Sequence, residues 1–271
     1  MIMHFITKFI QRTFREGVPS YAAQIAYYMI LAIFPFITFV AMILTGTHLV
    51  TSSMIINAIE PIHTIPEAVK DMIVSVFNSL EKDSSSYFSI YLVLILYASS
   101  RATSSIANGI HRVYHTFETR NIFVRALLSI FYTIAFAVLI VLLVVLVLFG
   151  EAISKAAFNF LGLSQYYETT VTYLRYSFPA FLMFITYLLL YRFIPTRRVK
   201  FRFVWPGALF ASAISVIVSG IFSFSFSDIS RYQSLYGSVS QIIIIIIWLW
   251  LISLILLLGA VFNAVLIDFN Q

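Results

Sequence analysis

The sequence contains no cysteine, and this absence removes several kinds of chemistry at once. A chain without thiols has no disulfide, no cysteine nucleophile and no cysteine-ligated metal. Charge is also scarce: only 10% of the 271 residues are charged, whereas a soluble domain usually carries about 25%. A water-soluble protein of this composition would have to hide an apolar fraction of 61%. Because a lipid bilayer accepts apolar side chains directly, the composition predicts an integral membrane protein.

Long uncharged stretches predict where the chain crosses the bilayer. A helix needs about 20 residues to cross about 30 Å of hydrocarbon. Backbone groups in lipid must pair within the protein, so each crossing is expected to be a helix. The sequence therefore predicts an all-α, polytopic membrane helix bundle in a single domain. Its spans, about six in number, are expected near residues 22–49, 84–107, 126–150, 173–194, 203–226 and 242–267.

The basic residues are unevenly distributed between the connections. Of the 17 Lys and Arg residues, 12 lie in the amino-terminal segment and in the second and fourth connections, when Arg101 and Arg192 at the adjoining span ends are included. The positive-inside rule then predicts that both termini are cytoplasmic and that the protein lies in the cell membrane. Topology thus explains most of the net charge of +6, and nucleic acid is not an expected partner.

Two segments outside the spans have the apolar spacing of amphipathic helices. In the first, apolar residues from Ile2 to Ile10 lie largely opposite Lys8, Arg12 and Arg15. This pattern predicts a short helix on the inner leaflet, with a simple topogenic flank as the alternative. In the second, apolar residues from Val69 to Leu80 predict an outer amphipathic helix.

The end of the second predicted span is rich in small polar side chains. Ser100, Ser104 and Asn108 share one stripe of the expected helix, and Arg101 borders it. These four residues form a candidate substrate-binding site. A guanidinium can hold a phosphate or carboxylate through two parallel hydrogen bonds, and nearby hydroxyls and amides add further donors. The alternative is an arginine at the end of a span that extends to the lipid headgroups.

Two prolines and a basic cluster suggest further roles. Pro35 and Pro179 lie inside the first and fourth spans, where a proline kinks a helix. They are candidate hinges, and their separation by three spans fits an inverted repeat of the kind found in transporters. A cluster after the fourth span is predicted to contact anionic headgroups of the inner leaflet: Arg197, Arg198, Lys200 and Arg202. Small residues in the last two spans, such as Gly259 and Asn263, predict close helix packing rather than a substrate path.

Recognisable catalytic motifs are missing. The chain has no phosphate loop, dinucleotide fingerprint or HExxH zinc motif. His111 and His115 are four residues apart, which could suit a metal, but an ordinary surface pair is the favoured interpretation. Most acids fall in outer connections, and none lies deep in a span. We therefore expect no enzyme, no metal and no cofactor.

Several motifs together resemble those of the YihY/BrkB family over about residues 10 to 267. They are Ala22-Ala23-Gln24-Ile25-Ala26-Tyr27-Tyr28 before Phe34-Pro35, then Ser100-Arg101 with Asn108 and Arg112, and Gly259-Ala260-Val261-Phe262-Asn263. Val261 and Phe262 stand where the family pattern has Glu and Leu, which removes a potential buried carboxylate. The resemblance implies a six-span inner-membrane protein associated with moving envelope lipids. It also brings an old label, ribonuclease BN, which the residue pattern disfavours.

These observations predict a transporter or flippase for an anionic lipid or a lipid-linked envelope precursor. Membrane lipids with anionic headgroups are the expected partners, and the sequence leaves homo-oligomers open. One alternative is a non-catalytic scaffold that binds envelope-assembly proteins. The other is a membrane-embedded enzyme, for which the sequence offers few acids or histidines that could converge.

Overall fold

The computed structural model describes most of the chain as helix. The described residues are 2–46, 53–54, 57, 70–71, 73–75, 88–117, 119–121, 123–124, 127–128, 130–131, 134, 167–196, 199–225 and 239–269. Regular structure in these ranges is entirely helical, which confirms the all-α prediction for this part of the chain. The helices are α1 (Ile2–Arg15), α2 (Val18–Gly46), α5 (Phe88–Val113), α7 (Tyr167–Phe193), α8 (Phe201–Ser225) and α10 (Val239–Phe269).

Five of the predicted spans coincide with α2, α5, α7, α8 and α10. The third predicted span, 126–150, lies almost wholly outside the described residues, as does most of the outer amphipathic segment. Within that segment, residues 70–71 and 73–75 are helical, but Lys70 is buried rather than on an exposed polar face. The total of six spans stays a prediction.

Length and apolar character separate the helices into two groups. Among the described residues, Phe201–Phe222 and Ile243–Phe269 are long and apolar enough to cross a bilayer. Val18–Ile33 and Ala180–Phe193 are shorter apolar stretches. Their surfaces still expose large apolar side chains, including Leu209, Ile217 and Phe181, and such a surface suits contact with lipid.

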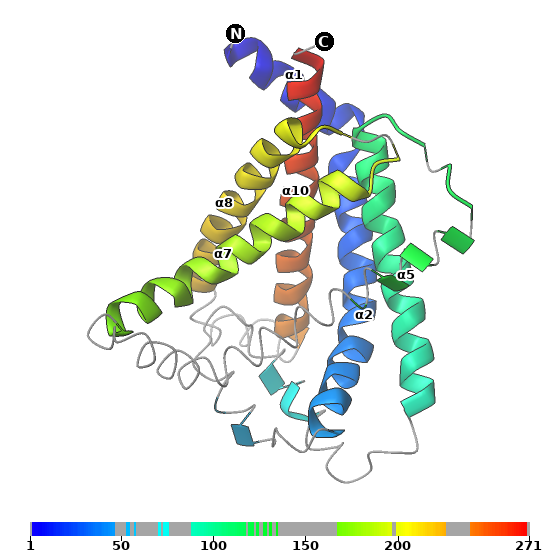
Figure 1. Cartoon of the computed structure of the whole chain (residues 1–271), viewed down its shortest axis with the longest axis vertical. Coiled ribbons are helices and arrows are strands. Elements are labelled where there is room, and N and C mark those ends of the chain that lie inside the picture. The colour runs from blue at the N-terminus through cyan, green and yellow to red at the C-terminus, as the bar shows by residue number, and fades with distance from the viewer. Residues whose placement is uncertain are drawn as a thin grey trace.

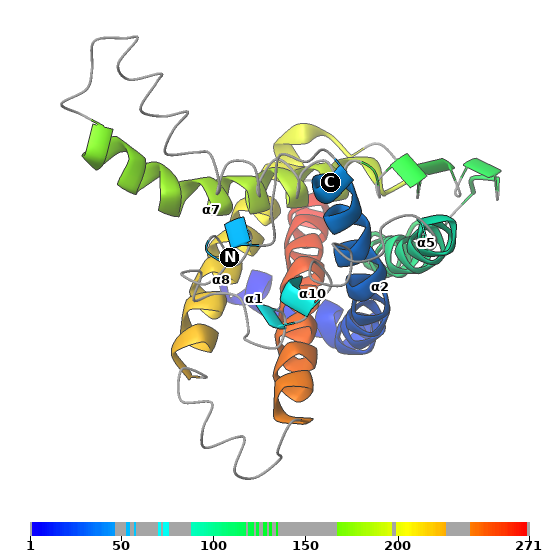
Figure 2. The same cartoon turned by 90° about the horizontal axis from the view of Figure 1, so that it is seen from below.

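Helix α10 lies in the middle of the bundle (Figures 1 and 2). It packs between α8 and α2, α5 packs on α2, and α7 crosses α8 at a steep tilt. The buried core follows this arrangement, with Ile25, Tyr191, Val204 and Leu257 among its fully enclosed side chains. Both chain termini lie at the same end of the bundle (Figure 1).

A sharp turn joins α1 to α2 at that end. Gly17 has a φ of +67°, a left-handed conformation that glycine adopts without steric strain. Its N–H donates to the carbonyl of Phe14, and its own carbonyl accepts from Ser20 and Tyr21. The chain can therefore end α1 and begin α2 with only two intervening residues, so α1 lies across the end of the bundle (Figure 1).

The amphipathic pattern of α1 is divided between two environments. Phe5 and Phe9 pack against Phe262 and Phe210, whereas Met3 and Phe14 are strongly exposed. Arg12 was expected on the exposed polar side, and this expectation is wrong because its side chain is buried. The exposed apolar residues would still suit a helix that rests on a leaflet.

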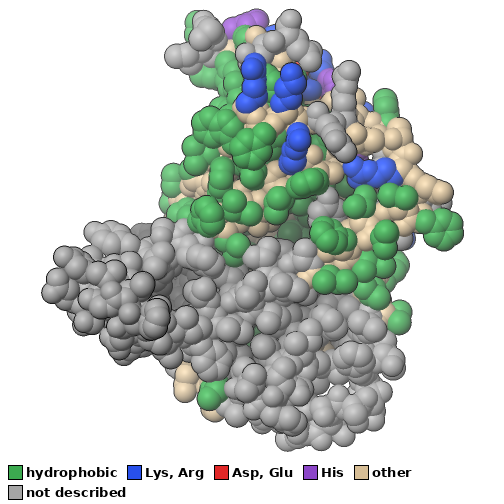
Figure 3. All heavy atoms as spheres, in the orientation of Figure 1, with side chains coloured by type: hydrophobic (Ala, Val, Ile, Leu, Met, Phe, Trp, Pro, Cys, Tyr) green, Lys and Arg blue, Asp and Glu red, His purple; other side chains and the backbone are tan. Residues whose placement is uncertain are grey.

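Positive charge gathers at the end that holds the termini, here called the basic end and marked by Arg15, Arg112, Lys200 and Arg202. On the face drawn in Figure 3, the Lys and Arg side chains that are visible lie towards this end, beyond a broad apolar surface. The distribution is the one that the positive-inside rule describes for a cytoplasmic side. The cytoplasmic assignment itself stays a prediction.

Candidate functional site

The four candidate substrate residues lie on one side of α5. At about 100° per residue, Ser100, Arg101, Ser104 and Asn108 fall within an arc of about 100°. Arg101 and Asn108 are exposed, and Ser100 and Ser104 are half-buried. We call this surface the α5 polar face. The structure thus brings the four predicted residues together on an outer surface of the described bundle.

Arg101 rests against an aromatic ring one turn earlier on the same face. Its guanidinium carbon lies 5.4 Å from the centre of the Tyr97 ring, a distance suited to a cation–π contact. Among the described residues, no carboxylate forms an ion pair with Arg101. Its N–H groups are therefore not committed to a charged partner within this part of the chain.

The depth of Arg101 follows from the length of the helix that carries it. Helix α5 continues to Val113, which is 12 residues beyond Arg101. At about 1.5 Å per residue, Arg101 lies about 18 Å from the end of the helix. Half the hydrocarbon thickness of a bilayer is about 15 Å. Arg101 therefore lies near the middle of α5, farther from the end of the helix than half that thickness.

The other predicted residues lie elsewhere. Pro35 is buried in α2, which continues through it, and Pro179 lies within α7. Lys200 and Arg202 are exposed at the start of α8, where the Arg202 guanidinium lies 4.6 Å from the Phe203 ring centre. The remaining members of the basic cluster, Arg197 and Arg198, are outside the described residues. The hinge and headgroup roles stay predictions.

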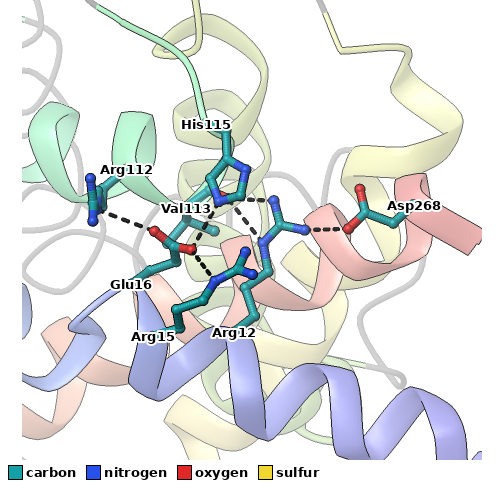
Figure 4. Close-up of polar contacts among 7 residues, drawn as sticks. All are labelled: Arg12, Arg15, Glu16, Arg112, Val113, His115 and Asp268. Atoms are coloured by element: carbon teal, nitrogen blue, oxygen red, sulfur yellow. Dashed lines mark hydrogen bonds and ion pairs between the residues drawn. The ribbon is translucent and has the colours of Figure 1, made fainter.

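Arg12 ties three helices together at the basic end (Figure 4). Its Nε and Nη2 donate to the carbonyl oxygen of Val113 at 3.2 and 2.8 Å, and its Nη1 pairs with the carboxylate of Asp268. Val113 ends α5, so the guanidinium satisfies a carbonyl that the helix leaves without a partner of its own. Asp268 lies at the end of α10. The buried arginine therefore fixes α1 to both α5 and α10.

A second group of charges surrounds Glu16, in the turn after α1 (Figure 4). Arg15 Nε and His115 Nε2 each lie 2.9 Å from Oε1 of Glu16, and Arg112 Nε lies 3.2 Å from Oε2. We call Glu16, Arg15, Arg112 and His115 the Glu16 cluster. It joins the α1–α2 turn to the end of α5, next to the α5 polar face.

Glu16 keeps its negative charge although it is only 6% exposed. Burial raises the pKa of this carboxyl, but hydrogen bonds and charge from His115 and Arg15 outweigh burial, and the net effect is a lowered pKa. The group is therefore an acceptor for its cationic neighbours at any pH near neutrality.

A Glu16→Gln variant should test this electrostatic role through the pH dependence of stability. Because the pKa of Glu16 in the folded protein is below its ordinary value of 4.5, the stabilisation is complete above that value and is lost as the pH falls through the lowered one. At neutral pH we expect the variant to be about 1 kcal/mol less stable than the wild type. The difference should shrink towards pH 4 or below, roughly where the carboxylate takes up a proton.

The measurement is the thermal midpoint of the detergent-solubilised protein, followed across pH for both chains. Arg15, Arg112 and His115 are the groups that contact Glu16, and all three are present in both proteins. A stability difference that grows on acidification would contradict the assignment.

The two spaced histidines do not form a surface pair. His111 is buried, and its Nδ1 lies 2.8 Å from the hydroxyl of Thr116. His115 lies beyond the end of α5 with a φ of 51°, so the two rings no longer share a helical face. Among the described residues, no group of three or more His, Cys, Asp and Glu could hold a metal ion.

Buried polar contacts also lock α7, α8 and α10 together. The Tyr191 hydroxyl donates to the carbonyl of Leu256 at 2.6 Å, and the Tyr187 hydroxyl lies 2.8 Å from that of Ser215. Asn263 accepts from the Gly207 N–H at 2.7 Å and donates to the carbonyl of Val204 at 3.1 Å. The predicted packing role of Asn263 is confirmed, and its side chain adds a two-sided hydrogen-bond clamp on α8.

Sequence reasoning missed the Glu16 cluster, although a signal was present. Only three of the 11 acids lie on the predicted cytoplasmic side: Glu16, Glu118 and Asp268. Two of these three form ion pairs with arginines of that side. Acids that are rare among many basic residues are natural partners for them, and this imbalance could have marked Glu16 and Asp268 as paired.

Comparison with known proteins gives the chain a family. Residues 9–269 match the family described as virulence factor BrkB. The ribonuclease-like protein YfkH of Bacillus subtilis is 30% identical over 266 residues, which cover 97% of this chain and 95% of YfkH.

A UPF0761 membrane protein of Idiomarina loihiensis is 30% identical over 128 residues, which cover 46% of this chain and 45% of that protein. A UPF0761 membrane protein of Glaesserella parasuis is 28% identical over 172 residues, 62% of this chain and 57% of that protein. No solved structure matches the chain.

Proposed function

The chain belongs to the virulence factor BrkB family of membrane proteins, and from this premise we propose that it moves an anionic lipid, or a lipid-linked envelope precursor, across the cell membrane. The proposal puts the basic end in the cytoplasm. It assigns headgroup binding to the α5 polar face, with Arg101 as the principal ligand. The resemblance to membrane proteins of this family supports the location, and the geometry of α5 supports the substrate class.

The position of Arg101 is the observation that carries the proposal. An arginine at the centre of a membrane helix costs about 2.5–3.5 kcal/mol on insertion scales. Arg101 is exposed about 18 Å from the end of α5, given about 1.5 Å per residue, and no described carboxylate offsets its charge. A phosphate-bearing headgroup would supply that charge and accept two parallel hydrogen bonds. When no headgroup is bound, the guanidinium makes a cation–π contact with Tyr97, and a bound phosphate can displace this contact.

The neighbouring side chains suit the same ligand. The hydroxyls of Ser100 and Ser104 can donate to phosphate oxygens, and the amide of Asn108 can donate to phosphate or to polar headgroup substituents. Ser100 adjoins Arg101, and Ser104 and Asn108 extend from it towards the basic end of α5. A headgroup could therefore exchange hydrogen bonds stepwise along α5 while its acyl chains remain in lipid.

A reconstitution assay tests the function directly. Full-length protein is placed in vesicles containing fluorescent phosphatidylglycerol, and dithionite is added to bleach the outer leaflet. We expect bleaching beyond the outer-leaflet fraction, at a rate that rises with protein content and is at least about tenfold faster for phosphatidylglycerol than for phosphatidylcholine. Empty vesicles and vesicles with an unrelated helical membrane protein are the controls. Equal rates with the unrelated protein would refute the proposal. If envelope-assembly proteins co-purify with this chain and no lipid flux is measured, the scaffold alternative is favoured.

The proposal also holds that the chain is not an enzyme, in contrast to the ribonuclease-like description of YfkH. The described surface offers basic residues at one end, but general acid–base cleavage of RNA needs groups placed to take and give protons. Incubation of the purified protein with labelled single-stranded RNA, with and without divalent metal ions, tests this point. An RNA-cleaving activity that copurifies with the folded protein would overturn the proposal that the chain is not an enzyme.

A further inference from the structure

The Glu16 cluster has the chemistry of an anion-binding site. Two guanidinium groups and an imidazole converge on one carboxylate at 2.9–3.2 Å. The same groups bind phosphate oxygens in proteins, because guanidinium and imidazolium N–H groups form strong, charge-assisted hydrogen bonds. A site that holds a carboxylate in this way is therefore assembled for anions generally.

The cations of the cluster remain accessible. The side chain of Glu16 is only 6% exposed, whereas those of Arg15, Arg112 and His115 are 69%, 56% and 50% exposed. Each guanidinium has five N–H donors, and the contact with Glu16 uses only Nε of each arginine. Within the described part of the chain, their outer donors have no charged partner, so they can meet a second anion without removing Glu16.

The charges do not cancel within the cluster. Arg15 and Arg112 bring two positive charges against the single negative charge of Glu16, and protonation of His115 adds another. Asp268, the other described carboxylate at the basic end, pairs with Arg12. Among the described residues, the cluster therefore keeps a surplus of at least one positive charge.

The cluster also continues the α5 polar face. Arg112 follows Asn108 by four residues and Ser104 by eight, so it extends the same side of the helix to the basic end. A headgroup bound by Arg112 would lie about one helical turn, or about 5.4 Å, from Asn108. The Glu16 cluster and the α5 polar face therefore adjoin along one side of α5.

We propose that Arg15, Arg112 and His115 form an entrance site for the phosphate of an anionic lipid headgroup. In this site Glu16 positions the three side chains and lowers their affinity for the phosphate. The site rests on the proposed function, because it feeds the α5 polar face. Glu16 orients three side chains that would otherwise be mobile, and its negative charge weakens binding enough for the headgroup to move on. The same chemistry would serve a free phosphate, so the test separates the two sources.

The test measures equilibrium binding of fluorescent short-chain phosphatidylglycerol to the full-length protein in neutral detergent, without transport. Arg112→Gln and Arg15→Gln should each raise the dissociation constant about tenfold, since each removes a charge-assisted contact. Glu16→Gln should lower it severalfold, because the amide no longer competes for the cations. The matched control is Lys8→Gln, which removes one charge from α1 at the same end and should change binding less than about twofold. Arg15 is largely exposed and outside the helix interfaces, so its variant keeps the test valid if Arg112→Gln folds poorly.

Two comparisons decide the ligand. Phosphatidylcholine of the same chain length should bind at least about tenfold more weakly than phosphatidylglycerol. Inorganic phosphate that competes at equal concentration would assign the site to free anions and overturn the lipid assignment. Equal weakening by Lys8→Gln and Arg112→Gln would reduce the site to general surface charge and also overturn it. If phosphatidylglycerol binding depends on the arginines but no flux is measured in vesicles, the entrance site is supported and the proposed transport is refuted. If flux is measured but Arg112→Gln and Arg15→Gln bind phosphatidylglycerol like the wild type, only the entrance site is refuted.

Discussion

Replacing Gly207 with alanine should destabilise the protein by about 3 kcal/mol or more. Gly207 lies where α8 crosses α10, and a methyl group there would overlap the carbonyl oxygen of Gly259 and the side-chain amide of Asn263. A backbone carbonyl cannot rotate away as a flexible side chain can. Asn263 is itself held by the Gly207 N–H and the Val204 carbonyl, so it has little freedom to move. The helices would have to separate, which would also loosen the contact of Tyr191 with Leu256.

Gly220→Ala on the same helix is the matched control. Among the described residues, nothing lies within 4 Å of the position that its methyl group would occupy. Alanine favours a helix over glycine by up to about 1 kcal/mol, so this variant should be neutral or slightly stabilised. Heating the detergent-solubilised proteins and following the loss of the monodisperse species by size-exclusion chromatography gives the two midpoints. A similar midpoint for both variants would show that the close approach of α8 and α10 does not matter for stability.

The sequence predicted the course of the helices better than their ends. The second span was predicted to end at residue 107, but α5 continues to Val113. Hydropathy registers only the change from apolar to polar residues, whereas the helix continues until its last carbonyls meet a partner. That partner is Arg12, more than 100 positions earlier in the chain. An end fixed by a distant side chain cannot be located from local polarity.

The same reason explains which site residues were found. Ser100, Arg101, Ser104 and Asn108 lie within one helix, so helical periodicity alone brings them to one face. Glu16 and Arg112 are 96 positions apart, and their contact depends on how α2 packs on α5. Gly207 and Asn263 likewise meet only because α8 crosses α10 at that point. Small residues predicted close packing in both helices, but not which pair would touch.

Burial separates the polar residues of this bundle into two classes. Asn263, Tyr191 and Arg12 are enclosed and use their donors on backbone carbonyls, which suits a structural role. Arg101 and Asn108 are exposed and make no comparable contact with another described helix. A polar group that stabilises nothing within the bundle and would be costly in hydrocarbon is the better candidate for a ligand.

An Arg101→Ala variant should therefore retain the fold and lose transport. We expect headgroup translocation in reconstituted vesicles to fall at least about tenfold, the loss that corresponds to about 1.4 kcal/mol of binding or barrier energy. The stability of the variant should equal or exceed that of the wild type, because alanine favours helix formation and removes a charge from the part of α5 that the proposal places within the bilayer. Opposite changes in flux and stability are what separate a ligand from a structural residue.

Two further variants make the result specific. Arg101→Lys keeps the charge but loses the two parallel hydrogen bonds, so its flux should lie between those of the wild type and Arg101→Ala. Lys8→Ala removes a positive charge from α1 at the basic end, where Lys8 rests over Phe269, and should leave flux within about twofold. Wild-type flux in Arg101→Ala would remove this arginine from the path. Loss of flux in all three would instead point to a general need for positive charge, because the α5 polar face would then have no advantage over any other basic position.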